Sequence, residues 1–155
     1  MTMNSIKIVD YKPVHQPWFE KFNRYWIEKY FVMEPVDEFV LTNPGEALLK
    51  TGGAILMAEF DGEVAGTVAL RKIDGTTFEF TKMAVDNKFQ RKGIAEALSH
   101  ASFKKAKALG ADRVILYSNS VLTPAISLYE KLGFEHVPVG DVEYKRSDVK
   151  MEILV

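Results

Sequence analysis

Basic residues gather between an apolar run and a segment with helical spacing. The run ends at Val85, a short polar connection follows, and Gly93 opens the helical segment, so the sequence predicts strand, loop and helix. Backbone N–H groups in the first turn of a helix lack partners within the helix, and the helix dipole adds positive charge there. Arg91 and Lys92 add two positive side chains, and Gly93 lets a ligand approach the backbone closely. This arrangement is typical of a loop that binds phosphate groups.

The basic residues of this loop also fit a role without a ligand. Lys88, Arg91 and Lys92 could decorate a solvated surface loop, because charge clusters are common on protein surfaces. Two known phosphate loops do not fit. The sequence has no Gly-x-x-x-x-Gly-Lys-Ser/Thr run, and no Gly-x-Gly-x-x-Gly follows a predicted strand.

The composition excludes several classes of protein. A formal net charge of −1 and 47% hydrophobic residues argue against nucleic-acid binding through bulk charge and against a disordered chain. No stretch approaches the roughly 20 apolar residues that cross a bilayer, and the N-terminus does not resemble a secretory leader. We therefore expect a cytoplasmic protein with no membrane partner. Cysteine is absent, and the histidines, which lack metal-ligand spacing and predict no metal site, are His15, His100 and His136.

The rest of the chain consists of segments with strand and helix patterns. Apolar runs predict strands at residues 6–11, 54–60, 63–73, 78–85, 113–118, 134–139 and 150–155. Helical spacing predicts helices from Pro17 through Lys29, from Gly93 to Gly110, and from Thr123, as the N-cap, to Gly133. Asp61-Gly62 and Asp74-Gly75 are turn signals, so the second, third and fourth strands are predicted to form an antiparallel meander.

These elements predict a mixed α/β fold in one domain that spans residues 1–155. The helix between residues 85 and 113 is a crossover, which makes the two strands that flank it parallel neighbours. Strict alternation on the strand before the loop predicts one face with Glu79, Thr81, Met83 and Val85, and another with Phe78, Phe80, Lys82 and Ala84. A carboxylate would thus share a face with the strand end that meets the loop.

The order of residues in two motifs points to a known family. Gln90-Arg91-Lys92-Gly93-Ile94-Ala95 resembles the Gln/Arg-x-x-Gly-x-Gly/Ala loop with which the GNAT family of N-acetyltransferases binds the pyrophosphate of acyl-CoA. The preceding residues, 82–85, look like that family's fourth strand, and residues 125–134 resemble its second hallmark. With the ending at residues 144–151, the likeness covers nearly the whole chain.

The resemblance implies a central, mostly antiparallel sheet that is splayed open between two parallel strands, with helices on both faces and acyl-CoA in the splay. It implies a CoA site made of Met83, Ala84, Val85, Gln90, Arg91, Lys92, Gly93, Ile94, Ala95, Asn119, Ala125 and Tyr129. In the family, strand amides at the position of Val85 bind the pantetheine and the thioester carbonyl. Many members carry an Asn at the position of Leu122, and Asn119 is the residue that could replace it here.

The resemblance also implies an enzyme that moves an acetyl group from acetyl-CoA to a primary amine by direct attack in a ternary complex. Tyr129 matches the tyrosine with which family members often protonate the departing thiolate, and the alternative is a packed aromatic on the helix stripe. Glu79 could take the proton of the acceptor ammonium, directly or through water, and the alternative is a surface carboxylate on a half-exposed strand.

Two other functions stay open on the sequence alone. One is a non-catalytic acyl-CoA sensor, and the other is a protein-interaction module whose patch consists of Trp18, Tyr25, Trp26, Tyr30 and Phe31. Core packing is the expected role of Trp18 and Phe22. The aromatics and carboxylates from Tyr30 to Glu34 could instead line the acceptor pocket. The acceptor itself, a small-molecule or peptide amine, is not specified, and a homodimer is common in the family.

Overall fold

The computed structural model describes residues 5–140 and 145–155, and within them seven strands form one sheet. Residues 1–4 and Tyr144, on which parts of the sequence prediction fell, lie outside the described residues. The strands are β1 (Ile6–Asp10), β2 (Ala54–Phe60), β3 (Glu63–Lys72), β4 (Thr77–Val85), β5 (Arg113–Ser118), β6 (Glu135–Val137) and β7 (Val149–Leu154). The helices are α1 (Gln16–Tyr30), α2 (Pro35–Thr42), α3 (Ile94–Ala108) and α4 (Thr123–Leu132), with shorter turns η1 (Pro13–His15), η2 (Gly45–Leu49) and η3 (Asn87–Phe89).

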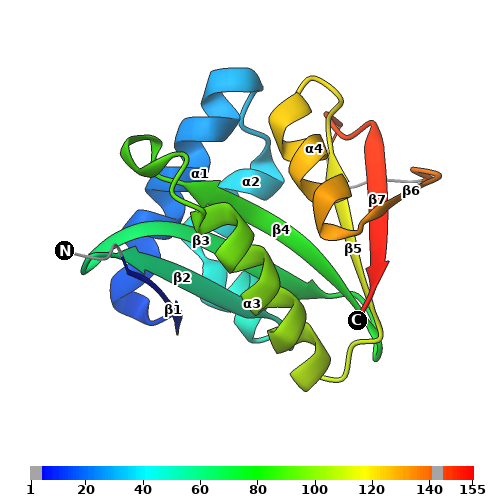
Figure 1. Cartoon of the computed structure of the whole chain (residues 1–155), viewed down its shortest axis with the longest axis horizontal. Coiled ribbons are helices and arrows are strands. Elements are labelled where there is room, and N and C mark those ends of the chain that lie inside the picture. Colours follow the sequence, from blue (N-terminus) through cyan, green and yellow to red (C-terminus); the bar gives the residue numbers. More distant parts are fainter. Residues whose placement is uncertain (1–4, 141–144) are drawn as a thin grey trace.

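The order of strands across the sheet is β1-β2-β3-β4-β5-β7-β6 (Figure 1). The first four strands are antiparallel, β4 and β5 are parallel, and β7 is antiparallel to both of its neighbours. Asp61 and Gly62 both have positive φ, 48° and 87°, as the tight hairpin turn between β2 and β3 requires. The mixed α/β fold, the meander and the parallel crossover predicted from the sequence are thereby confirmed.

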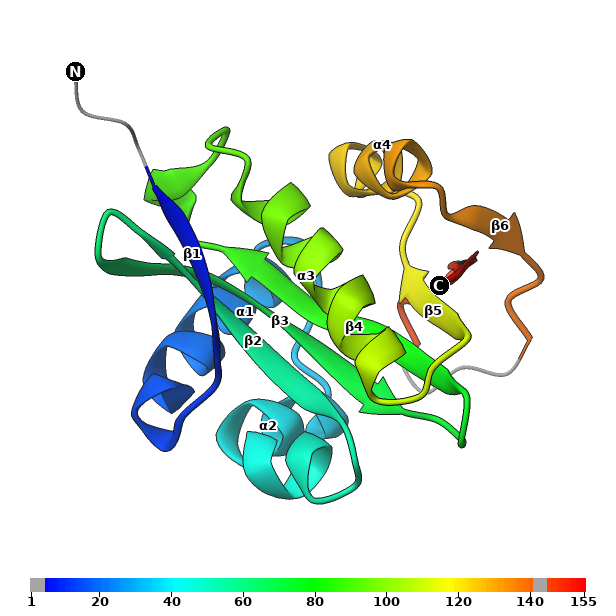
Figure 2. The same ribbon diagram turned by 60° about the horizontal axis from the view of Figure 1, so that its bottom comes forward.

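Helices cover both faces of the sheet (Figure 2). One apolar cluster joins α3 and α4 to the strands through residues such as Phe78, Leu98 and Phe134. A second cluster lies on the opposite face and joins α1 and α2 to β2 and β3 through Phe19, Leu41, Met57 and Ala69. The helix α3 approaches β3 so closely at Gly66 that a Cβ there would lie 3.2 Å from side-chain atoms of Ile94 and Leu98.

Three details of the helices differ from the sequence prediction. The buried stripe of α1 consists of Phe19, Phe22, Asn23 and Ile27, whereas Trp18 is 38% exposed, so core packing was right for Phe22 and wrong for Trp18. The polar segment after Pro35 forms α2, which the sequence did not predict, because its apolar spacing covers little more than two turns. The N-cap of α4 is Leu122 instead of Thr123, without a capping bond from its side chain.

Candidate active site

A cavity opens where β4 and β5 separate. In the described part of the chain their ladder comprises the pairs Thr77 with Arg113, Phe78 with Val114 and Glu79 with Ile115, after which the two strands diverge (Figure 1). The cavity has a volume of about 510 Å³ and takes its lining from α1, β4, β5, α4, the first turn of α3 with Gln90 before it, the loop after β5, and residues 146–147. One backbone edge of β4 beyond Glu79 therefore faces this space. The splay that the resemblance implied is present.

A β-bulge in β4 changes which side chains face the two helical layers. Thr81 pairs with Ala69 and Ala84 with Thr67, so Lys82 and Met83 together lie opposite the single residue between those partners. Lys82 takes up the extra residue with a φ of 54°. The predicted alternation is wrong beyond this point: Met83 and Val85 pack with Phe78 and Phe80 on the α3 side, and Glu79 does not share their face. A left-handed lysine gives no sequence signal, which is why strict alternation failed.

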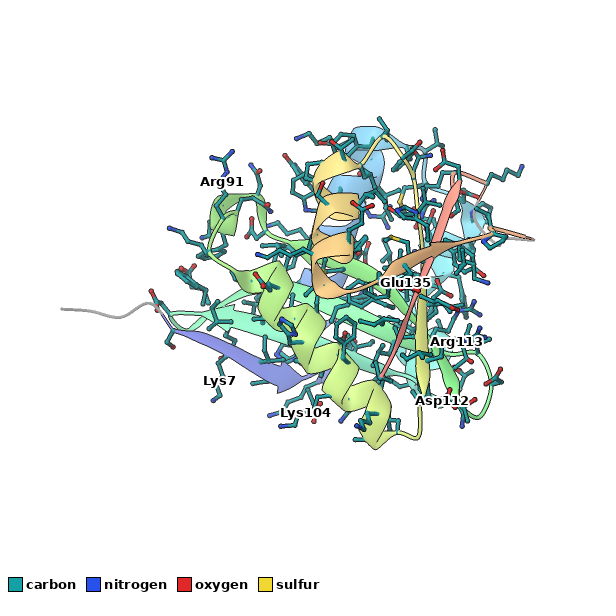
Figure 3. The ribbon with its side chains drawn as sticks, turned by 45° about the vertical axis from the view of Figure 1, so that its right-hand side comes forward. Lys7, Arg91, Lys104, Asp112, Arg113 and Glu135 are labelled. Carbon is teal, nitrogen blue, oxygen red and sulfur yellow. The ribbon has the colours of Figure 1, made fainter. Side chains whose placement is uncertain are left out.

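The loop before α3 contains two residues in the left-handed backbone region. Gly93 is the N-cap of α3 in the left-handed region, with φ 81° and ψ 11°, and a Cβ there would meet only Ile6 at 4.0 Å. Arg91 also has positive φ, 61°, and Figure 3 shows its side chain pointing away from the sheet. Glycine is thus required for its φ, and the space beside it stays accessible. Lys92 is exposed, whereas Lys88 pairs with Glu63 at 3.1 Å.

Two residues of this loop that were predicted to bind the cofactor, Gln90 and Ile94, have side chains that contact the protein itself. Gln90 lines the cavity, but its side-chain amide donates a hydrogen bond to the carbonyl oxygen of Val85 at 3.0 Å. The indole N–H of Trp26 donates to the same oxygen at 2.9 Å. The side chain of Ile94 is buried in the core beneath α3, so only its backbone can reach a ligand. Ala95 lines the cavity.

The helix α4 forms the opposite wall. Ala125 and Tyr129 both line the cavity, and the Tyr129 ring lies 5.7 Å from the Phe80 ring in an edge-on arrangement. Burial raises the pKa of Tyr129 to about 12, so its hydroxyl stays protonated at neutral pH. Asn119 lines the cavity as well, yet its amide is bonded within the protein: Nδ2 donates to the Arg146 carbonyl at 2.6 Å, and Oδ1 accepts from the backbone of Val121 at 2.9 Å.

Glu79 is a buried, paired carboxylate on the wall of the same cavity. It is 3% exposed, which rules out the half-exposed surface role that the sequence left open. Arg71, its cross-strand neighbour on β3, donates two hydrogen bonds to one of its oxygens, at 2.8 Å and 3.0 Å. The arginine therefore fixes the direction of the carboxylate.

A charge cluster beside Glu79 was not found from the sequence. We call Glu34, Asp37, Lys82 and Arg146 the charge cluster. Asp37, fully buried, accepts hydrogen bonds from Lys82 at 3.0 Å, from both terminal nitrogens of Arg146 at 2.8 and 2.9 Å, and from the Glu34 backbone at 2.9 Å. Burial alone would raise the Asp37 pKa, but the Arg146 hydrogen bond and the Lys82 charge outweigh it and lower it to about 2. Asp37 is thus ionised at neutral pH.

The aromatic residues of α1 divide between the cavity and the surface. Trp26, Tyr30 and Phe31 line the cavity, so the expectation that the helix end lines a pocket agrees with the structure. Tyr25 is 43% and Tyr30 47% exposed, and the Lys29 ammonium lies 5.1 to 5.8 Å from the ring centres of Tyr25, Trp26 and Tyr30.

Neither a metal centre nor a membrane span is found in the described chain. Among residues 5–140 and 145–155, no three histidine, aspartate or glutamate side chains are grouped so that they could hold a metal ion. Within the same ranges, the helices are too short or too polar to pass through a bilayer. What the cavity offers is a backbone edge, a helix N-terminus, two titratable side chains and a cluster of paired charges.

Comparison with known proteins shows which family this chain resembles in sequence. The model of the acetyltransferase (GNAT) family matches residues 11–134. N-acetylaspartate synthetase of Rattus norvegicus is 33% identical over 110 residues, which are 70% of this chain and 34% of that protein. The chain thus spans about a third of the length of that relative.

Solved structures share the fold over nearly the whole chain. An acetyltransferase of the GNAT family from Staphylococcus aureus Mu50 has a TM-score of 0.87 at 19% identity, over 97% of this chain and 99% of that chain. PaiA N-acetyltransferase from Thermoplasma acidophilum, solved in complex with coenzyme A, has a TM-score of 0.76 at 18% identity, over 97% and 99%. With the splayed sheet, the loop before α3 and a family match over most of its length, this chain belongs to the acetyltransferase (GNAT) family.

Proposed function

We propose that the protein is an acetyl-CoA-dependent N-acetyltransferase, which moves an acetyl group to a primary amine by direct attack in a ternary complex. The observation that carries this proposal is the position of the cavity. It borders the open edge of β4 and the residues next to the α3 N-terminus on one side, and Glu79 with the aromatic end of α1 on the other. One space can thus hold both reactants, which replaces a bimolecular encounter by a fixed geometry.

The residues present suit acetyl-CoA. The first amides of α3, next to Arg91 and Lys92, offer hydrogen bonds and positive charge to a pyrophosphate, and Gly93 keeps their approach open. The pantetheine arm would follow the β4 edge along Met83, Ala84 and Val85 and face Ala125 and Tyr129 across the cavity. The side chains of Gln90, Asn119 and Ile94 serve the protein instead, by bonding Val85, by holding the C-terminal segment and by packing in the core.

In the proposed reaction, the neutral amine attacks the thioester carbonyl, a C–N bond forms, and the C–S bond breaks. The backbone amide of Val85, on the edge of β4 that faces away from β3, stabilises the negative charge that develops on the carbonyl oxygen, an effect typically worth about 3 kcal/mol per donor. Glu79 takes the proton of the acceptor ammonium, directly or through water. The Tyr129 hydroxyl, protonated throughout the neutral range, delivers a proton to the leaving thiolate. The second proton that the nitrogen loses as the amide forms passes through water and restores the Tyr129 hydroxyl.

The acceptor in this proposal is a small amine. N-acetylaspartate, which gives the relative its name, is an acetylated amino acid, and the likeness to that relative covers 70% of this chain. The cavity wall that would face such an amine combines Glu79, Tyr30 and Phe31 with Lys82 and Arg146 of the charge cluster. These residues come from three separate segments, so the pocket depends on the tertiary fold.

Binding and turnover can be measured separately. Coenzyme A at a hundredfold excess over its Kd should stabilise the protein against heat by about 2.7 kcal/mol, whereas adenosine should stabilise it much less. A screen of amines should then release thiol from acetyl-CoA, with kcat/KM rising as pH rises, and Glu79→Gln should lower the rate most at neutral pH. Stabilisation by coenzyme A without turnover of any amine would favour an acyl-CoA sensor. No stabilisation at all would refute the assignment of the loop.

A further inference from the structure

We propose that the amine acceptor carries a carboxylate and that Arg146 binds this carboxylate in exchange for Glu34. The inference rests on the proposed function and names its substrate class. Arg146 lies near the C-terminus, 109 residues from Asp37, and its side chain is 18% exposed on the wall of the cavity. An arginine is suited to this task, because its planar guanidinium matches the two oxygens of a carboxylate.

The charge cluster presents its positive groups to the cavity. Lys82 and Arg146 belong to the cavity lining, whereas the buried carboxylate of Asp37 does not. Asp37 therefore lies behind the two cations and holds them through three hydrogen bonds of 2.8 to 3.0 Å. An acceptor in the cavity meets the cationic side of this cluster.

Glu34 and Asp37 differ in how readily they can leave Arg146. Asp37 is fully buried, and removing it would leave two cations without their common partner. Glu34 has a side chain that is 20% exposed; it accepts one hydrogen bond from Arg146 at 2.9 Å and a longer one from the Lys145 backbone at 3.3 Å. Because it is partly exposed, Glu34 can turn to water at a lower cost than Asp37, and the carboxylate of an acceptor can take its place at Arg146. The same chemistry holds Arg146 before and after the exchange.

The backbone of Arg146 is fixed from the other side. Asn119, at the end of β5, donates a hydrogen bond to the Arg146 carbonyl at 2.6 Å, and the Ser120 backbone and hydroxyl both donate to Asp148 at 2.8 Å. The guanidinium also lies over the Phe31 ring, 5.8 Å from its centre. These contacts position Arg146 before an acceptor arrives, so little ordering remains to be done on binding.

A second charge in the cavity completes the match to an amino acid. Glu79 lines the same wall, and Arg71 directs its carboxylate. The electrostatic fields of Glu79 and Arg146 both act on Lys82, which lies in their vicinity. A zwitterion fits this pair of opposite charges, with its ammonium toward Glu79 and its carboxylate toward Arg146. An amine without a carboxylate would interact with Glu79 but not with Arg146.

The test compares amino acids with their amides. Glycine, L-aspartate, L-glutamate, L-methionine and L-phenylalanine are each assayed beside the compound in which every carboxylate is a carboxamide, by release of thiol from acetyl-CoA. We expect at least one of the five acids to be acetylated with a kcat/KM about 10- to 100-fold above that of its amide, the range that a charged hydrogen bond supplies. If amides and acids react equally, the inference fails while the proposed function stands.

Substitutions of Arg146 and of Glu34 should change the KM of the acid in opposite directions. Arg146→Met should raise the KM of the acid about 10- to 100-fold and leave the KM of its amide and of acetyl-CoA unchanged, and Arg146→Lys should recover only part of the loss. Glu34→Gln should lower the KM of the acid, because the competing charge is gone. A matched control is Arg24→Met, since Arg24 also joins two carboxylates but lies outside the cavity lining.

Each remaining outcome decides the question. Arg146→Met is checked for folding by its stabilisation with coenzyme A, and Glu34→Gln, which keeps Asp37 paired, tests the exchange if the first variant does not fold. A Glu34→Gln enzyme with a higher KM for the acid than wild type would overturn the inference. If coenzyme A binds but neither acids nor amides are turned over, the substrate class fails, and the enzyme assignment fails as well if no other amine of the screen is turned over. An absence of coenzyme A binding would refute the proposed function first.

Discussion

The two sides of the cavity are built from different parts of the polypeptide. The proposed cofactor side uses backbone: the left-handed Gly93, the N-terminus of α3 and the open edge of β4. The proposed acceptor side uses side chains: four charged groups from α2 and its N-cap, β4 and the C-terminal segment hold one another at distances of 2.8 to 3.0 Å. A backbone site tolerates many side chains but needs a particular φ, whereas a side-chain site fails when one partner is removed. Substitutions on the two sides should therefore have different consequences.

Asp37→Ala should be the most destructive change on the acceptor side. It leaves Lys82, with its side chain 4% exposed, next to the like charge of Arg146, and breaking a buried pair in this way costs about 3–5 kcal/mol of the free energy of unfolding. Urea denaturation measures the loss. Glu46→Ala is the control, since its pair with Lys50 is exposed and its removal should cost less than about 0.5 kcal/mol.

A compensating variant separates charge from packing in that experiment. Asp37→Leu combined with Lys82→Met replaces the pair by apolar groups and should recover part of the loss. A loss below about 1 kcal/mol for Asp37→Ala would mean that the acceptor side does not depend on its side chains, and the contrast between the two sides would collapse.

Gly93→Val should damage the cofactor side without unfolding the core. The residue has a φ of 81°, where a branched side chain is strained, and its Cβ points to space that only Ile6 borders, at 4.0 Å. Weakened bonds to the charged pyrophosphate should raise the KM for acetyl-CoA about 10²-fold and change the KM for the amine little. Gly75→Val is the control, because nothing lies within 4 Å of its Cβ and its φ is not in the left-handed region. Equal effects on both KM values would count against the loop.

The same contrast explains what the sequence could predict. The strands lie within two residues of their predicted ends, and the cofactor loop has its predicted strand-loop-helix form, because both follow from neighbouring residues. The charge cluster was missed because Asp37 and Arg146 are separated by 109 positions, and no local spacing records their contact. Lys82 was placed on the wrong face because a bulge shifts alternation and a left-handed lysine gives no warning.

The contacts of the side chains in the predicted cofactor motif could not be predicted from neighbouring residues either. The motif gives the order of Gln90, Gly93 and Ile94, but not that the amide of Gln90 bonds Val85 or that Ile94 packs in the core. Trp18 shows the same limit, since helical spacing could not tell which side of the aromatic stripe meets the sheet. Sequence and structure agree on the local course of the backbone around Gly93, where strand, loop and helix follow one another as predicted.

Tyr129→Phe tests a side chain that belongs to the cofactor side. Phenylalanine preserves the contacts with Phe80 and Phe134, so the free energy of unfolding should change by less than about 1.5 kcal/mol. We expect kcat to fall about 10²-fold or less, because a thiolate with a conjugate-acid pKa near 8.5 is a tolerable leaving group and the tyrosine, with a pKa of about 12, is a weak acid. Tyr25→Phe, exposed on α1, is the control. A wild-type rate under conditions where release of coenzyme A does not limit turnover would make Tyr129 a packing residue.

Protonation of Asp37 at low pH should remove its contribution to the free energy of unfolding. The pKa of Asp37 falls from 3.8 to about 2 on folding, so its contribution is fully present above about pH 4 and is lost as pH falls through 2. The shift corresponds to about 2 kcal/mol of the free energy of unfolding. The difference in free energy of unfolding between wild type and Asp37→Asn should shrink by about that amount from pH 5 to pH 2, because other carboxylates contribute equally to both proteins. Parallel profiles would show that Asp37 is not strongly perturbed.

The smallest expected effect lies where the two sides of the cavity meet. The Val85 carbonyl accepts one hydrogen bond from Trp26 on α1, at 2.9 Å, and another from Gln90 in the cofactor loop, at 3.0 Å. Gln90→Met removes one donor at similar volume, and Trp26→Phe removes the other, so each single change leaves the oxygen with a partner.

Each single variant should therefore lose about 0.5–1.5 kcal/mol of the free energy of unfolding beyond its change in packing. The double variant leaves the carbonyl without either side-chain donor, and it should lose more than the sum of the two single changes, since an unsatisfied polar group costs more than one shared bond. Trp26→Phe also disturbs the stacking with Tyr30, but that term appears in both arms of the cycle and cancels in the coupling energy. Strict additivity would mean that the two bonds act independently, and that the cofactor loop and the acceptor helix are not linked through Val85.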